Sequence, residues 1–148
     1  MNYQTKCYHC GHIKVAYVSY LSKQLVRALR KLVDYYDDTK KPCNLQKDLD
    51  LTKNQYNNFQ KLQYFNLAKR SDIGWFPTLQ GIQFIKGKEE AIDMIATIES
   101  EVLDFDHEAW KTHNSKPKPV MIWDIDKDSW KQKVEYQAEK SQQINIFS

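Results

Sequence analysis

Two cysteines near the start of the chain could bind a metal ion. Cys7 and Cys10 are two residues apart and Gly11 follows them. At this spacing a tight turn can present two thiolates to one zinc ion, and a structural zinc site takes four ligands. The other two could come from His9, His12, Cys43 or the same cysteine pair of a second copy. Zinc is therefore a candidate cofactor, and the alternative is a turn that holds two reduced thiols.

A second group of side chains could read DNA bases. Residues 53–64 predict a helix whose outward positions are polar and include no carboxylate. Asn can pair with two atoms of adenine, and Lys can reach guanine or a phosphate. We expect DNA contacts from Lys53, Asn54, Asn57, Asn58 and Lys61, with Gln55 and Gln60 at the margins of this face. The alternative is a solvated helix face in a domain that binds protein.

Further basic residues lie on both sides of this helix in the sequence. Lys69 and Arg70 fall in a predicted hairpin, where they could enter the minor groove or hold phosphates, which positions a protein without reading sequence. They could equally be ordinary exposed bases at a strand end. An earlier helix carries four more bases that could extend a DNA footprint, although we favour a role in solubility for Lys23, Arg27, Arg30 and Lys31.

A long helix should precede these elements. Ser19 or Ser22 can cap a helix that runs to about residue 38. Its apolar stripe repeats at spacings of three and four, as in Leu21, Leu25, Leu29, Leu32 and Tyr36. Pro42 disfavours helical geometry in the residue before it, so the helix should end by residues 39–42.

Two short helices should then form a helix-turn-helix. Asn44 can cap residues 45–50, and Thr52 can cap residues 53–64. On the second of these helices we expect Tyr56, Phe59 and Leu62 to face inward. A short helix, a tight turn and a capped polar helix are the parts of a helix-turn-helix.

A hairpin and another helix complete this core. Residues 67–70 and 75–77 predict two strands around a turn at 71–74, with Pro77 suited to a sheet edge. Thr78 can cap a helix over residues 79–86 that ends at Gly87. A hairpin that follows the second helix of a helix-turn-helix is a wing.

The residues of this core resemble a family. The runs 61–67, 74–76 and 78–87 are similar to a pattern found in small bacterial and phage winged-helix proteins, which often begin with a C-x-x-C-G knuckle like that of residues 7–11. The resemblance covers about residues 7–88. It implies the winged-helix fold and a DNA-associated or mobile-element context. The sequence departs from a full zinc ribbon because a second cysteine pair is missing.

The C-terminal part predicts a small extension of another character. Residues 94–98 and 102–105 fit two short strands better than one helix, and residues 114–119 read as a linker. Residues 120–125 should form a strand, and Asp128 should cap a last helix over residues 129–140. Asp124, Asp126 and Asp128 alternate, but without a glycine turn or a distal Glu they indicate a strand end and a cap rather than a calcium loop.

Charge divides the chain in the same way. Residues 1–88 contain 15 lysines and arginines against 6 aspartates and glutamates, a net charge of +9. Residues 89–148 contain 7 against 13, a net charge of −6. A basic part is expected to meet a polyanion, and an acidic part is suited to another partner or to dimerisation.

Composition excludes several classes of protein. The three cysteines do not make a disulfide framework, so a reducing cytoplasm, bacterial or in a phage-infected cell, is the simplest location. No apolar run is long enough to span a membrane, and the N-terminus has no secretory pattern. The chain has four glycines and none of the phosphate-loop, G-x-S-x-G or H-E-x-x-H motifs, so we expect no enzyme.

The sequence therefore predicts an α+β protein in three segments. These are a cysteine knuckle (1–18), a winged helix-turn-helix core (19–88) and a small acidic α/β extension (89–148). The expected function is binding of double-stranded DNA by a phage or bacterial transcription regulator. The alternative is a protein-interaction module, such as a phage-encoded inhibitor of a host complex, that uses the wing or the acidic extension. A homodimer is compatible with either.

Overall fold

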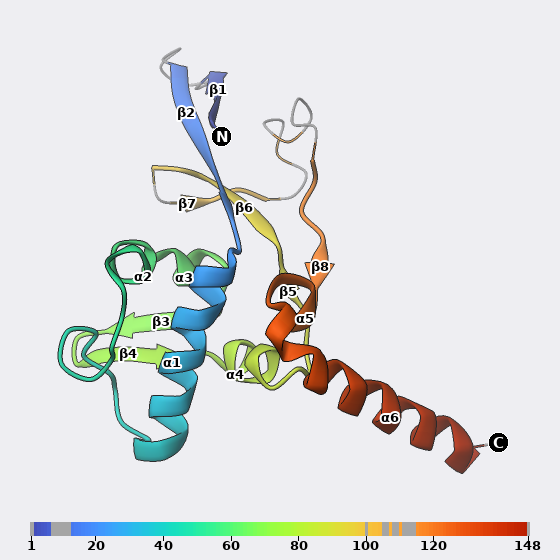
Figure 1. The fold of residues 1–148 in the computed structure, drawn as a ribbon. Coiled ribbons are helices and arrows are strands. Elements are labelled where there is room, and N and C mark those ends of the chain that lie inside the picture. Colours follow the sequence, from blue (N-terminus) through green and yellow to red (C-terminus); the bar gives the residue numbers. More distant parts are fainter. Residues whose placement is uncertain are drawn as a thin grey trace.

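The computed structural model describes residues 2–6, 13–99, 101–104, 107, 110 and 115–147. It has the mixed α+β character that the sequence predicts, with helices packed beside small antiparallel sheets (Figure 1). The helices are α1 (Lys23–Thr39), α2 (Lys53–Asn58), α3 (Lys61–Tyr64), α4 (Leu79–Ile85), α5 (Ile122–Ile125), a 3₁₀ helix (Lys127–Ser129) and α6 (Trp130–Phe147). The strands are β1 (Asn2–Lys6), β2 (Ile13–Tyr20), β3 (Ala68–Ser71), β4 (Gly74–Pro77), β5 (Ala91–Ile92), β6 (Met94–Ile98), β7 (Glu101–Val102) and β8 (Pro119–Val120). Across these ranges no helix is both long and apolar enough to cross a membrane.

Helix α1 is the central element, and its predicted bounds are confirmed. The Ser22 side chain accepts a hydrogen bond from the Leu25 N–H at 3.2 Å, which starts the helix. The helix ends where Lys40 adopts a left-handed conformation and donates its N–H to the Tyr36 carbonyl. The apolar stripe of α1 is buried in the main core, where Leu29 and Leu32 have no exposed surface.

The predicted helix over residues 45–50 is wrong. Asn44 instead caps a single turn, because its side chain accepts the N–H groups of Gln46 and Lys47. The Asp48 carboxylate closes the turn by accepting the Asn44 N–H at 2.8 Å. Short polar side chains that bond to nearby backbone compete with helix propagation, so the segment stops after one turn.

The predicted helix over residues 53–64 is divided in two. Thr52 caps it as expected, but the chain turns at Phe59 and Gln60 between α2 and α3. Backbone bonds at the break join residues three apart, such as Leu62 N–H to the Phe59 carbonyl. Phe59 is fully buried and meets Trp75 edge-on with ring centroids 5.0 Å apart. Packing of this aromatic pair holds the break in place.

The hairpin and the helix after it form as predicted. β3 and β4 are antiparallel, with Ser71 opposite Gly74 across the turn. The Thr78 side chain caps α4 by accepting the Gly81 N–H at 2.9 Å. Helix α4 lies against the backbone that leads into β3, and a Cβ atom on Gly81 would be only 2.1 Å from the Leu67 carbonyl oxygen. Only glycine allows this close approach.

One sheet joins the N-terminal strands to two strands that follow α4. Its strand order is β1-β2-β6-β7, and β2 pairs with β6 through Tyr17–Thr97 and Tyr20–Met94. The strand expected over residues 94–98 is confirmed as β6, whereas the one expected over residues 102–105 is found instead at Glu101–Val102. Residues 2–20 add the strands β1 and β2. Trp110 is buried with Val18, Met94 and Ala96 in a small second core on this sheet. Where β2 meets α1, the Leu21 N–H donates to the Asp93 carbonyl at 2.8 Å.

The C-terminal part differs from its prediction in two places. The expected strand over residues 120–125 ends at Val120, and α5 follows because the Asp124 carboxylate accepts the Met121 N–H and Ile122 is buried. Asp128 does not cap the last helix. Asp126 accepts the Asp128 N–H and begins the 3₁₀ helix, after which α6 continues to Phe147 rather than to residue 140. In Figure 1, α6 extends away from the body of the molecule.

Candidate nucleic-acid interface

A reciprocal cap fixes the start of α2. The Thr52 hydroxyl accepts the Gln55 N–H at 3.1 Å, and the Gln55 side chain accepts the Thr52 N–H at 3.1 Å. This arrangement satisfies two backbone donors that a helix otherwise leaves open. It places Lys53 and Asn54, both exposed, on the first turn of the helix.

Gln55 attaches α2 to α1. It takes the inward-facing position that the sequence predicted for Tyr56. The Gln55 side chain is 3% exposed; it accepts from Lys31 Nζ at 3.0 Å and donates to the Gln24 side chain at 3.2 Å. Tyr56, expected to face inward, is instead 43% exposed. The expected inner face of α2 and α3 is right for Phe59 and Leu62, which are fully buried.

A cleft of about 540 Å³ lies between α2, the Asn44 turn and the β3–β4 hairpin. Tyr56, Asn57 and Gln60 line its helix side, and Arg70 lines its hairpin side. The Gln46 side chain donates to the Tyr56 hydroxyl at 2.9 Å and joins the turn to the helix. Two predicted DNA-binding residues, Asn57 and Arg70, thus meet at one cleft.

The hairpin separates the two bases that the sequence placed together. Neighbouring residues of a strand point to opposite faces, and cross-strand partners share a face. Arg70 is paired with Trp75 on the face turned toward the cleft, and Lys69 is paired with Phe76 on the other face. Phe76 contacts Tyr36 of α1 with ring centroids 6.2 Å apart. Lys69 therefore lies outside the cleft.

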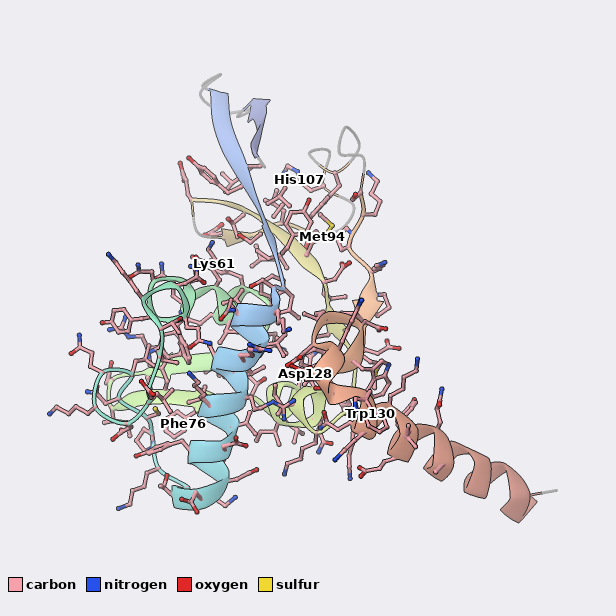
Figure 2. All side chains as sticks on the ribbon, in the orientation of Figure 1. Lys61, Phe76, Met94, His107, Asp128 and Trp130 are labelled. Atoms are coloured by element: carbon pink, nitrogen blue, oxygen red, sulfur yellow. The ribbon has the colours of Figure 1, made fainter. Side chains whose placement is uncertain are left out.

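The other predicted residues differ in how free they are. Within the described ranges, no hydrogen bond or ion pair engages the side chains of Lys53, Asn54, Asn57, Lys61, Lys69 and Arg70. Asn58 is different, because its side-chain amide donates to the Asn54 carbonyl at 2.8 Å. Asn58 is therefore committed to the end of its own helix. Lys61 opens α3 and is half-buried, on the side of the molecule that Figure 2 shows across α1 from Trp130.

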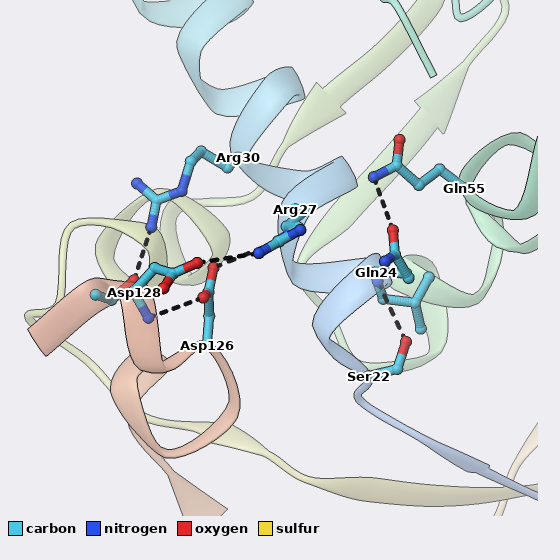
Figure 3. Close-up of polar contacts among 9 residues, drawn as sticks. Ser22, Gln24, Arg27, Arg30, Gln55, Asp126 and Asp128 are labelled. Carbon is cyan, nitrogen blue, oxygen red and sulfur yellow. Dashed lines mark hydrogen bonds and ion pairs between the residues drawn. The ribbon is translucent and has the colours of Figure 1, made fainter. Parts of the chain in front are cut away.

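Most basic side chains of α1 make contacts within the protein. The sequence predicted instead that they extend a DNA footprint or serve solubility. Arg27 Nη2 is 3.0 Å from Asp128 Oδ2, and Arg27 Nε is 4.0 Å from Asp126 Oδ2 (Figure 3). Arg30 donates to the Ser129 hydroxyl at 3.0 Å. Lys31 donates to the Asp50 carbonyl as well as to Gln55. Part of the acidic extension is therefore attached to α1.

Cys43, another candidate zinc ligand, lies in the main hydrophobic core. It is fully buried and exchanges backbone hydrogen bonds with Trp75, 2.9 Å in each direction. Burial raises the pKa of its thiol to about 11, and Asp48 adds to the effect, so the thiol keeps its proton at neutral pH.

The rest of the zinc prediction lies outside the described residues. Cys7, Cys10, His9 and His12 all fall in the connection between β1 and β2, at positions 7–12. Among the residues that the structure does describe, no group of His, Cys, Asp and Glu side chains is arranged to hold a metal ion. Zinc at Cys7 and Cys10 stays a prediction.

Comparisons with known proteins give no match. No protein-family model matches the sequence, and the searches of curated proteins and of solved structures found nothing similar. Any functional assignment must therefore come from the geometry of the chain itself.

The sequence did not predict that Gln46 and Tyr56 line the cleft. Gln46 was assigned to a helix, and Tyr56 was assigned to the core. The signal for Tyr56 was its neighbour: with Thr52 as the cap, Gln55 sits at the position from which a capping-box side chain reaches back. When the Gln55 side chain is held toward the core in this way, Tyr56, the next residue of the helix, points outward.

Proposed function

We propose that this protein binds double-stranded DNA as a winged helix-turn-helix protein. The order of the elements supports the proposal: a long helix, a capped polar helix, an antiparallel hairpin and a further helix. The Asn44 turn takes the place of the first short helix of the motif. In such proteins the second helix of the motif enters the major groove and its N-terminal residues contact base edges.

One observation carries the proposal. On the surface formed by α2, α3 and the β3–β4 hairpin, most exposed polar side chains are amides, lysines or arginine; Ile73 and Tyr56 are exposed beside them, and Asp72 is the single carboxylate between residues 51 and 75. The bases there have no internal partner within the described part of the chain. Lysine and arginine side chains without partners can neutralise phosphates, and amide side chains can pair with the edges of DNA bases.

The roles follow from position. Lys53 and Asn54 are exposed on the first turn of α2 and would meet the floor of the groove with Asn57. Arg70, at the mouth of the cleft, would hold a phosphate, and Lys69 would hold another from the far face of the hairpin. The resemblance to small bacterial and phage winged-helix proteins adds the expectation of a regulatory role.

The test is binding of the full chain to a fluorescent random-sequence duplex, measured by anisotropy at several salt concentrations. We expect affinity to fall steeply with salt because bound phosphates release counterions. Lys53→Ala/Arg70→Ala should weaken binding to all sequences and lower the slope of log K against log salt by about 1 for each lost phosphate contact.

The matched control is Lys131→Ala/Lys133→Ala. It removes the same charge from exposed positions on α6, across the molecule from α2 (Figure 1). Binding by this control should equal that of the unchanged protein. No binding at low salt, or equal losses in both double variants, would overturn the proposal and leave the protein-interaction module as the next function to test.

A further inference from the structure

The side chains on the proposed DNA-binding surface favour one class of base pair. Residues 53–66 contain no Arg, Asp or Glu. The exposed residues of α2 and the break after it include three amides, Asn54, Asn57 and Gln60, together with one aromatic side chain, Tyr56. This composition differs from that of a surface that only holds phosphates, where lysine and arginine side chains would dominate.

Each base offers a different edge in the major groove. Guanine is read most often by Arg, and the amino group of cytosine by a carboxylate; residues 53–66 contain neither, and Lys53 and Lys61 are their only side chains that could reach guanine. Adenine presents N7 and its amino group, which one Asn or Gln side chain can bind at the same time. Thymine presents a methyl group, which prefers an apolar contact.

The structure leaves the amides available for this pairing and holds the aromatic ring among them. Asn54 and Asn57 make no side-chain hydrogen bond within the ranges that the structure describes, and Asn57 and Gln60 line the cleft. The Tyr56 hydroxyl accepts from Gln46 at 2.9 Å, so the polar end of the ring is occupied, and the residue as a whole stays 43% exposed. Asn58 is excluded because its amide is bonded to the Asn54 carbonyl.

We propose that α2 reads A·T base pairs in the major groove, with Asn54 and Asn57 on adenine and Tyr56 against the thymine methyl group. The inference rests on the proposed DNA-binding function and narrows its substrate class to A·T-rich duplexes. Lys53 and Arg70 supply affinity to any sequence, and the amides and the tyrosine supply the choice between sequences.

The experiment compares four labelled duplexes of equal length by anisotropy with the unchanged full chain. The first contains only alternating A·T pairs and the second only alternating G·C pairs. The third replaces adenine with 7-deazaadenine, which removes N7, and the fourth replaces thymine with uracil, which removes the methyl group. Both modified duplexes change atoms of the major groove alone.

We expect the A·T duplex to bind about tenfold more tightly than the G·C duplex, the ratio that one well-made adenine contact provides. The 7-deazaadenine duplex should lose most of this preference, and the uracil duplex should lose a smaller part. Asn54→Ala/Asn57→Ala should lose most of the preference and keep only the smaller part that Tyr56 supplies. Gln137→Ala, an exposed amide on α6, should keep the full preference.

The outcomes separate this inference from the function on which it rests. Equal salt-sensitive binding to A·T and G·C duplexes would overturn the inference and leave DNA binding intact. A preference for A·T that survives both base modifications would place the reading in the minor groove and overturn the assignment to α2. Absence of binding to every duplex at low salt would overturn the proposed function itself.

Discussion

At the scale of single residues, Cys43 is the clearest case of a side chain whose chemistry is set by its surroundings. As the third cysteine of the chain, it was a candidate to complete a zinc site with Cys7 and Cys10. The fold buries it completely beside Trp75, and burial raises the pKa of the thiol from an ordinary value of 9.0 to about 11. The effect of pH on stability follows from that difference.

We expect the Cys43 thiol to make the protein less stable as pH rises from 9 to 11. The unfolded chain loses the Cys43 proton near pH 9, whereas the folded chain keeps it until about pH 11. In this window the folded state binds more protons, so the free energy of unfolding falls with pH, by at most about 3 kcal/mol. Urea unfolding at pH 8, 9.5 and 10.5 measures it.

The comparison protein is Cys43→Ala, which has the same other titrating groups. Its stability should be lower than that of the unchanged chain at pH 8, because a buried side chain is shortened, and the gap should narrow as pH rises. A gap that stays constant from pH 8 to 10.5 would show that the thiol does not contribute to the pH dependence.

Single residues were predictable from the sequence where their role is local. The caps at Ser22, Thr52 and Thr78 could be identified because a hydroxyl three residues before a backbone donor acts within one turn. The burial of Gln55 in place of Tyr56 could not be predicted, because a glutamine side chain is buried only where residues distant in the sequence make hydrogen bonds to it. Those partners are Lys31 and Gln24, both on α1.

At the scale of elements, α2 depends on its first residues. It has only six residues, too few for a helix to be stable alone, so its cap and its attachment through Gln55 carry much of its order. The proposed base-reading side chains all lie on this short segment or directly after it.

Removal of the Thr52 hydroxyl should therefore weaken both the fold and the proposed reading surface. Thr52→Ala leaves the Gln55 N–H without its acceptor, and we expect a loss of about 1 kcal/mol in the free energy of unfolding. Urea denaturation monitored by tryptophan fluorescence measures it. Thr52→Ser keeps the hydroxyl and should lose only a small part; a serine variant as unstable as the alanine variant would contradict the role of the cap.

Elements were predictable where an apolar pattern or a turn signal is strong, as in α1, the β3–β4 hairpin and α4. The helix over residues 45–50 failed because the Asp48 carboxylate accepts the Asn44 N–H and the Asn44 side chain accepts the Gln46 N–H, which closes the turn early. The strand over residues 120–125 failed because Asp124 makes a cap three residues after Met121. In both cases a side-chain hydrogen bond outweighed the apolar pattern.

At the scale of the whole molecule, the acidic C-terminal segment is docked on α1. The Gln132 side chain donates to the Ile85 carbonyl at the end of α4, and Arg30 holds Ser129 (Figure 3 shows the contacts with α1). The charge split of the sequence predicted two parts of opposite sign. It could not predict that Arg27 of one part pairs with aspartates of the other, because that contact joins residues about 100 positions apart.

We expect the two aspartates beside Arg27 to contribute unequally. Asp128 is closer, at 3.0 Å, but its side chain is 77% exposed, and such pairs contribute about 0.2–1 kcal/mol. The Asp126 side chain is 6% exposed and also accepts the Asp128 N–H, so Asp126→Asn should cost more than Asp128→Asn.

Double-mutant cycles with Arg27→Met measure both couplings in urea unfolding. The coupling between Arg27 and Asp128 should shrink in 1 M salt, where screening is strong. The prediction fails if Asp128→Asn destabilises the protein as much as Asp126→Asn does.

The pairing of β2 with β6 has a consequence for the order in which the chain folds. These strands lie at the two ends of the helix-rich part, and the bond from the Leu21 N–H to the Asp93 carbonyl marks where its ends meet. Closing so long a loop in an unfolded chain costs much entropy before any strand pair forms. We expect the segment from α1 to α4 to fold first and bring the strands together. During synthesis on the ribosome, β2 would then emerge early and remain unpaired with β6 until β6 has been synthesised.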